Sequence, residues 1–171
     1  MMAVLLFFVR GLHAGEQADF RAVYAVPSAA FHAMPGRQGL HGGQGVALAL
    51  GYDINEPLTV EASAGYASLE RRRDRARTAF MPLALDGIYH FAHWDRFDPV
   101  LLLGAGYNMS DRRVFRGERG AFAVRAGGGF FYTLNETFSV RGTVAVYRPR
   151  DKAALSVTAS AGLVIYLWSA E

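Results

Sequence analysis

The fold is decided by stretches such as residues 58–66, LTVEASAGY, in which every second side chain belongs to one chemical class. One set is apolar and comprises Leu58, Val60, Ala62, Ala64 and Tyr66. The other set is small or polar and comprises Thr59, Glu61, Ser63 and Gly65. A period of two residues is typical of a β-strand, because successive side chains of a strand point to opposite faces.

The same alternation recurs along the chain and predicts an all-β protein. The expected strands are 19–31, 45–54, 58–69, 79–91, 100–110, 121–134, 138–148 and 154–168. Each is long enough for a tilted membrane-crossing strand, which needs about 9–11 residues. No apolar run reaches the roughly 18 residues of a membrane-crossing helix.

The distribution of charge between the two faces predicts which face is inside. A soluble barrel carries charged side chains outside and large apolar ones within. Here the apolar set of each strand is nearly free of charge, whereas the other set contains Ala, Gly, Ser, Thr and isolated charges. Small side chains suit the narrow lumen of an eight-stranded barrel. We therefore expect an eight-stranded antiparallel up-and-down transmembrane β-barrel whose apolar set faces lipid.

The connections between the expected strands alternate in length. Residues 55–57 and 135–137 are short and turn-like, whereas 32–44, 70–78 and 111–120 are longer and polar. Bacterial membrane barrels have short periplasmic turns and long outer loops. Two segments depart from this pattern, because 92–99 is long for a turn and 149–153 is short for an outer loop.

Residues 1–18 are interpreted as a signal peptide, which leaves 19–171 as the barrel domain. The segment has an apolar centre at Ala3–Val9, followed by Gly11 and by alanines at 14 and 18. The chain contains no cysteine, so neither a disulfide framework nor a cysteine-based metal site is available.

The last expected strand carries the most specific motif. Residues 160–167, SAGLVIYL, follow the order polar, any, glycine, two of any kind, apolar, any, apolar, and Trp168 adds an aromatic residue. In this motif the chain resembles the small porin-like barrels typified by outer-membrane proteins A and X, over about residues 19–168. The resemblance implies a location in the outer membrane of a Gram-negative bacterium and recognition of the last strand by the outer-membrane insertion machinery. It implies no cofactor.

The lumen-facing set contains a small group of charges. These are Arg21, Asp53, Glu61, Asp86, Arg125 and Arg141. Unpaired charges are costly away from water, so we expect arginine–carboxylate pairs inside the barrel, with Glu61 or Asp86 as the partner of Arg141. The favoured interpretation is a structural plug, and the alternative is a gated path for ions through a narrow channel.

Arginine is concentrated in the expected outer loops. The residues are Arg71, Arg72, Arg73, Arg75 and Arg77 in one loop, Arg112, Arg113, Arg116 and Arg119 in another, and Arg148, Arg150 and Lys152 at a third. Arginine can hold phosphate through two hydrogen bonds, so these loops are candidates to bind lipopolysaccharide in an outer membrane. A merely solvated face is the competing interpretation. Nucleic acid is not expected as a partner, because the loops lack aromatic stacking residues.

A lipid A-modifying enzyme is the competing class of protein. Such barrels need a histidine with a serine and a carboxylate at the membrane rim. No His-x-Ser sequence occurs, and only His32 and Ser28 lie near each other in sequence. His90 and His93 are interpreted as a histidine pair of a turn, and no metal site is expected. The sequence therefore predicts a non-enzymatic barrel with a structural or surface-interaction role.

The signal-peptide interpretation predicts the start of the mature protein. Because an apolar start followed by small residues is typical of a cleaved export signal, sequencing of the membrane-extracted protein should begin between about Gly15 and Asp19. Recovery of intact Met1 would contradict the interpretation.

Overall fold

Eight strands make up the protein in a computed structural model that describes residues 22–33, 40–71, 77–111, 120–149 and 155–169. The strands are β1 (Ala22–Ala33), β2 (Leu40–Asn55), β3 (Leu58–Arg71), β4 (Arg77–His90), β5 (Phe97–Ser110), β6 (Gly120–Thr133), β7 (Phe138–Pro149) and β8 (Ser156–Ser169). No helix in this part of the chain is long and apolar enough to cross a membrane.

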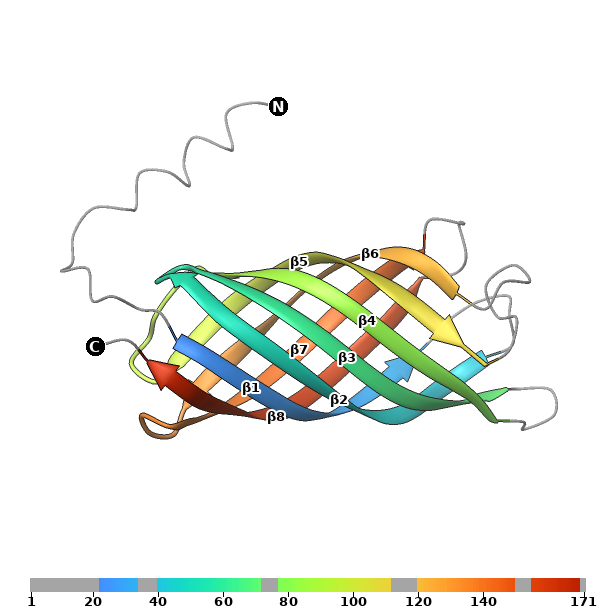
Figure 1. Cartoon of the computed structure of the whole chain (residues 1–171), viewed down its shortest axis with the longest axis horizontal. Coiled ribbons are helices and arrows are strands. Elements are labelled where there is room, and N and C mark those ends of the chain that lie inside the picture. Colours follow the sequence, from blue (N-terminus) through green and yellow to red (C-terminus); the bar gives the residue numbers. More distant parts are fainter. Residues whose placement is uncertain (1–21, 34–39, 72–76, 112–119, 150–154, 170–171) are drawn as a thin grey trace, which may run out of the picture.

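The strands form one closed antiparallel barrel. Each strand pairs with its neighbours in chain order, and β1 pairs with β8 to close the sheet. Figure 1 shows the strands wound obliquely around a common axis, with β1 beginning and β8 ending at the same end of the barrel. Closure leaves no sheet edge, so every strand finds backbone partners on both sides.

The two faces of the barrel have the polarity that the sequence predicts. Leu103 and Phe122 are each 66% exposed on the outer wall, and Val46 is 64% exposed. By contrast, Glu61 and Asp86 are only 1% and 2% exposed, because they point into the lumen. This arrangement is the inverse of a soluble protein and is typical of a barrel whose outer wall contacts hydrocarbon.

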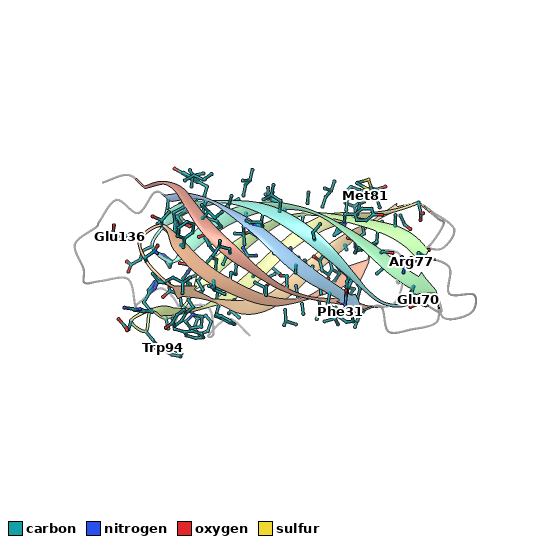
Figure 2. All side chains as sticks on the ribbon, turned by 90° about the horizontal axis from the view of Figure 1, so that it is seen from below. Phe31, Glu70, Arg77, Met81, Trp94 and Glu136 are labelled. Atoms are coloured by element: carbon teal, nitrogen blue, oxygen red, sulfur yellow. The ribbon has the colours of Figure 1, made fainter. Side chains whose placement is uncertain are left out.

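Three tight connections lie at one end of the barrel, which we call the turn end. Glu56 and Pro57 join β2 to β3, and a hairpin closed by two backbone hydrogen bonds between Trp94 and Phe97 (2.9 and 3.0 Å) joins β4 to β5. In the third turn, the side-chain oxygen of Asn135 accepts two backbone N–H bonds, both of 2.9 Å. Figure 2 places Trp94 and Glu136 at this end, and Glu70 and Arg77 at the opposite end.

The opposite end, which we call the loop end, is where residues 34–39, 72–76, 112–119 and 150–154 connect the strands. The sequence predicted longer connections there, from 32–44 and 70–78, and those bounds are wrong. Gly43 pairs with Leu69 and Glu70 with Arg77, so the strands continue past the apolar belt. Backbone pairing persists in water, where the outer face no longer needs apolar side chains.

The expected long connection at 92–99 is also wrong. β5 begins at Phe97, and the chain reverses within a two-residue turn in which Asp95 adopts a positive φ of 54°. Aspartate tolerates this left-handed conformation better than most residues. The rings of Trp94, Phe97 and Phe130 stack in series, with centroids 6.0 and 5.3 Å apart, so the turn lies close against the barrel.

The exposure of Leu103 at the middle of β5 generates a stability prediction. Leu103→Arg should destabilise the folded barrel in lipid by about 2–4 kcal/mol, because a charge at the bilayer midplane is costly. Leu103→Phe, which keeps the side chain apolar, is the matched control and should change little. Denaturant unfolding in lipid vesicles measures both variants, and equal stability of the two would argue against a lipid-facing wall.

Candidate functional site

The centre of the lumen is occupied by an ion pair between β3 and β7. Both terminal nitrogens of Arg141 donate to the carboxylate of Glu61, through Nη2–Oε1 (2.9 Å) and Nη1–Oε2. The two residues are 6% and 1% exposed. The sequence favoured Glu61 or Asp86 as the partner of Arg141, and Glu61 occupies that position. A bidentate pair satisfies both charges where water is scarce.

Aromatic side chains complete the surroundings of this pair. The Tyr24 hydroxyl donates to Glu61 Oε2 (3.2 Å), and the Arg141 guanidinium lies over the Phe131 ring at 5.5 Å. Tyr24 reaches Glu61 across Gly51, where an added Cβ would lie 2.1 Å from the tyrosine ring. Glycine at position 51 is therefore required by the close approach of the ring.

A second ion pair joins β4 to β6. Arg125 Nη1 donates to Asp86 Oδ2 at 2.6 Å, and the guanidinium lies 5.2 Å from the centre of the Tyr147 ring. Both charged side chains are buried. Among the described residues these four buried charges form two pairs, and each pair is flanked by an aromatic ring.

A further charge expected in the lumen, Asp53, is half-buried on the lumen side of β2. Asp53 lies near the turn end, where its Oδ1 accepts a hydrogen bond from Thr59 (2.5 Å). Thr59 Oγ1 is also 3.3 Å from His90 Nε2, and the His90 ring stacks on His93. The sequence analysis interpreted His90 as part of a turn, but His90 is the last residue of β4. Arg21 lies outside the described residues.

The turn-end histidines do not assemble a metal centre. His93 Nδ1 pairs with Asp98 Oδ1 at 2.8 Å, and His90 faces the lumen. Across the described ranges, no three histidine or acidic side chains come together in a way that could hold a metal ion.

Apolar side chains fill the lumen on both sides of the ion pairs. Near the loop end Ala67, Leu69, Phe80 and Ala121 form a buried cluster. A larger cluster, which includes Tyr24, Ile88, Val100, Phe131 and Val164, fills the rest. A cavity of about 40 Å³ remains beside Glu61, Arg125 and Arg141. A space of this size accommodates water but no larger solute.

The arginines expected in the outer loops fall mostly outside the described residues. Arg72, Arg73, Arg75, Arg112, Arg113, Arg116 and Arg119 belong to this group. Three of the set belong to strand ends instead, because Arg71 closes β3, Arg77 opens β4 and Arg148 lies next to the last residue of β7. Arg77 is exposed at the loop end, opposite Glu70 on β3.

Sequence reasoning missed several lumen residues that the structure brings to the ion pairs. Tyr24, Phe131 and Tyr147 all touch a member of a pair. Alternation along each strand assigns these rings to the lumen, so the signal was present. The contacts that these rings make could not be predicted from the sequence, because the contacts depend on the register between neighbouring strands.

A closed eight-stranded barrel with an apolar outer wall and paired charges inside is an integral membrane protein of the β-barrel class. Residues 2–161 match the family model described as the outer membrane protein beta-barrel domain. The chain therefore belongs to this family and resides in the bacterial outer membrane. No curated protein sequence matches it.

Solved structures with the same fold support this assignment. Neisserial surface protein A shares 17% identity, with 85% of this chain and 96% of that chain covered and a TM-score of 0.63. Ail of Yersinia pestis, solved in complex with the heparin analogue sucrose octasulfate, shares 15% identity (85% and 96% covered, TM-score 0.55). The outer membrane enzyme PagL shares 23% identity (82% and 98% covered, TM-score 0.55).

The buried pair of Glu61 and Arg141 generates a second stability prediction. Arg141→Ala should lower the free energy of unfolding by about 3–5 kcal/mol, because it strands a buried carboxylate. Arg96→Ala, at an exposed position of the turn end, should change it by less than about 1 kcal/mol. The double variant Arg141→Met with Glu61→Leu should recover much of the loss, because no charge remains unpaired.

Urea unfolding in detergent measures all three variants. Equal effects of Arg141→Ala and Arg96→Ala would show that the lumen is wet, and would favour a channel.

Proposed function

We propose that this chain is a non-enzymatic barrel whose basic loop end binds the phosphates of lipopolysaccharide. Its lumen serves as a structural plug, and its last strand is the segment read by the outer-membrane insertion machinery. In β8, the side chains of Leu163 and Leu167 point outward, whereas Gly162 and Tyr166 lie on the lumen side. The terminal motif therefore presents an apolar face to lipid.

The segregation of charge between the two ends carries the proposal. The strand order brings 72–76, 112–119 and 150–154 to the loop end, and each segment contains more basic than acidic residues. The acidic residues Asp53, Glu56, Asp95, Asp98 and Glu136 lie toward the turn end. Short turns are periplasmic in bacterial barrels, which assigns the basic end to the outer leaflet. That leaflet presents a phosphate-dense anionic surface.

The packing of the lumen supports a plug over a channel. Side chains that line a water-filled pore stay accessible to water, whereas Leu69, Phe80 and Phe131 are at most 3% exposed. Eight strands leave an interior just wide enough for side chains to fill.

The geometry around His32 and His90 supports a non-enzymatic role. His32 Nδ1 lies 2.8 Å from Thr158 Oγ1, and the Ser28 hydroxyl donates to the Ala47 carbonyl instead of to His32. In a catalytic triad, the carboxylate bonds the imidazole nitrogen opposite the one that faces the hydroxyl. Here Asp53 instead accepts the hydrogen bond of the Thr59 hydroxyl, and within the described residues His90 Nδ1 has no partner. Thr59 is also only 1% exposed, so substrate could not reach it. The likeness to PagL, at 23% identity, extends to the fold alone.

Lipopolysaccharide retention tests the proposal. Replacing Arg71, Arg72, Arg73, Arg75 and Arg77 by glutamine should reduce the lipopolysaccharide that co-purifies at low salt. The wild-type protein should lose lipopolysaccharide as salt rises, because exposed charge pairs are screened. Single replacements should have small effects, since each exposed pair contributes only about 0–1 kcal/mol.

Arg96→Gln, which removes a cation from the turn end, is the control and should retain lipopolysaccharide as the wild type does. Unchanged retention in the five-fold variant at low salt would leave only a solvated basic surface.

A further inference from the structure

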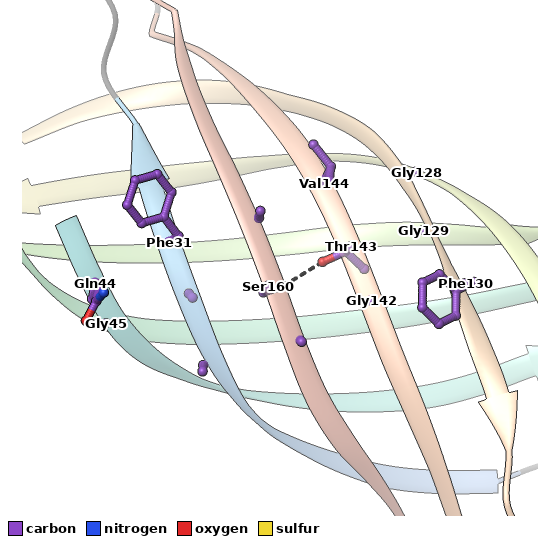
Figure 3. A pocket seen from close by; sticks show the side chains of 14 residues that line it. Phe31, Gln44, Gly45, Gly128, Gly129, Phe130, Gly142, Thr143, Val144 and Ser160 are labelled. Atoms are coloured by element: carbon purple, nitrogen blue, oxygen red, sulfur yellow. Dashed lines mark hydrogen bonds between the residues drawn. The ribbon is translucent and has the colours of Figure 1, made fainter. Parts of the chain in front are cut away.

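The lipid-facing wall contains a groove that crosses β6, β7, β8 and β1. Its volume is about 600 Å³, and Figure 3 shows it from close by. The floor is made by outward positions with small side chains or none: Ala29, Gly128, Gly142, Ala159 and Ala161. Elsewhere on the wall many outward positions carry large side chains, for example Leu101, Leu103 and Phe122.

Strand register aligns the residues of the groove. Phe31 lies opposite Gln44 on one side and opposite Ala159 on the other. The line continues from Ala159 to Val144 and from Val144 to Gly128. The groove therefore follows a line that crosses the strands, with Phe31 and Gln44 toward the loop end and Phe130 bounding its far part.

The polar atoms beneath the floor are already satisfied. The hydroxyls of Thr143 and Ser160 are 2.6 Å apart and hydrogen-bond to each other, as the dashed line in Figure 3 marks. The surface that remains open to a ligand is therefore hydrocarbon in character, apart from the exposed Gln44 amide at one end. Such a lining suits a linear apolar chain with a polar group at its head.

We infer that this groove holds an acyl chain of lipopolysaccharide, with its polar head toward Gln44. The wall faces hydrocarbon, so a depression in it is filled by a lipid chain or by protein. A second copy of the barrel fits poorly, because a twofold contact would place two concave surfaces face to face and leave a void. Phe31 is two residues from the end of β1 at the loop end, so the groove opens toward the outer leaflet.

A positively charged side chain, Arg148, lies between the groove and the loop end on the same outer face of the barrel. Arg148 is exposed near the end of β7 and shares the outward side of that strand with Val144. Four residues separate them, or about 13 Å along a strand. A phosphate at Arg148 is therefore compatible with a chain that passes Val144. This assignment rests on the proposed function, because it takes the basic end to be the lipopolysaccharide-binding end.

Affinity in this groove has an unusual physical origin. A chain that moves from the bilayer into the groove leaves one apolar medium for another, so the hydrophobic effect contributes little. Van der Waals contact with Phe31 and Phe130, together with the contacts of the head group, must favour the bound chain. The groove should accordingly select among lipids by shape and head group.

Site-specific photocrosslinking tests the occupant. A benzophenone amino acid replaces Phe31, an aromatic side chain that already bounds the groove, or Met81, an exposed residue on the outer side of β4 outside the groove. Each protein is reconstituted in vesicles of phospholipid alone or of phospholipid with lipopolysaccharide. We expect lipopolysaccharide adducts at 31 to exceed those at 81 by about threefold or more, a factor that weak packing contacts in a membrane can produce.

Equal lipopolysaccharide adducts at the two positions, preferential phospholipid adducts at 31, or a crosslinked dimer through 31 would each overturn the inference. Ala161→Phe in the groove floor, compared with Ala62→Phe on the outer side of β3 outside the groove, should reduce retained lipopolysaccharide, and equal retention by the two would also count against it. Heat-dependent gel migration checks that each variant is folded. The five-fold variant, in which Arg71, Arg72, Arg73, Arg75 and Arg77 are replaced by glutamine, separates the two proposals. Loss of its phosphate contacts should leave the preference of 31 over 81 detectable in lipopolysaccharide-rich vesicles.

Discussion

A backbone amide inside a bilayer has no water to bond to, and this constraint determines the rest of the structure. Every N–H and C=O group in the hydrocarbon must find a partner within the protein. A sheet meets the requirement only when its two edges meet, which β1 and β8 do here from the pair of Ala22 and Ser169 to the pair of Ala33 and Val157, with a register shift after Val23. Closure with eight strands then fixes a bore so narrow that side chains must fill it. The small residues on the lumen side of each strand follow from that bore.

The narrow bore also explains why the charges of the lumen occur as pairs. A single guanidinium surrounded by Leu, Phe and Val would lose its hydration without compensation. Glu61 provides both carboxylate oxygens to Arg141, and Tyr24 adds a further donor to the same carboxylate. The tyrosine can approach only because Gly51 has no side chain. Pairing, aromatic packing and glycine placement are thus parts of one solution to burying charge.

The sequence predicted the barrel well because alternation is a local property of each strand. This alternation predicts that Glu61, Asp86 and Arg141 lie on the lumen face of their strands. The partner of Arg125 and the role of Tyr24 did not follow, because they depend on the shift between strands that are distant in the chain. The groove could not be predicted from the sequence for the same reason. Ala29, Gly142 and Ala161 become neighbours only through the register of β1, β7 and β8. The strand ends at the loop end were predicted too short. Beyond the apolar belt the strands still pair, but their outward side chains need not be apolar, so the alternation of polarity is lost.

The two ion pairs have a consequence for the order of assembly. Each joins strands that are not neighbours in the sheet: Glu61 on β3 with Arg141 on β7, and Asp86 on β4 with Arg125 on β6. A flat or half-curled sheet holds Glu61 and Arg141 apart, so these two charges stay hydrated until the sheet closes. Asp86 and Arg125, by contrast, lie on either side of Gly104 on β5 and can pair earlier. Hydrocarbon excludes such a sheet more strongly than the finished barrel. The pairing of β1 with β8 is thereby coupled to the curling of the sheet and to the dehydration of the lumen. An incompletely closed barrel is therefore unstable in the bilayer.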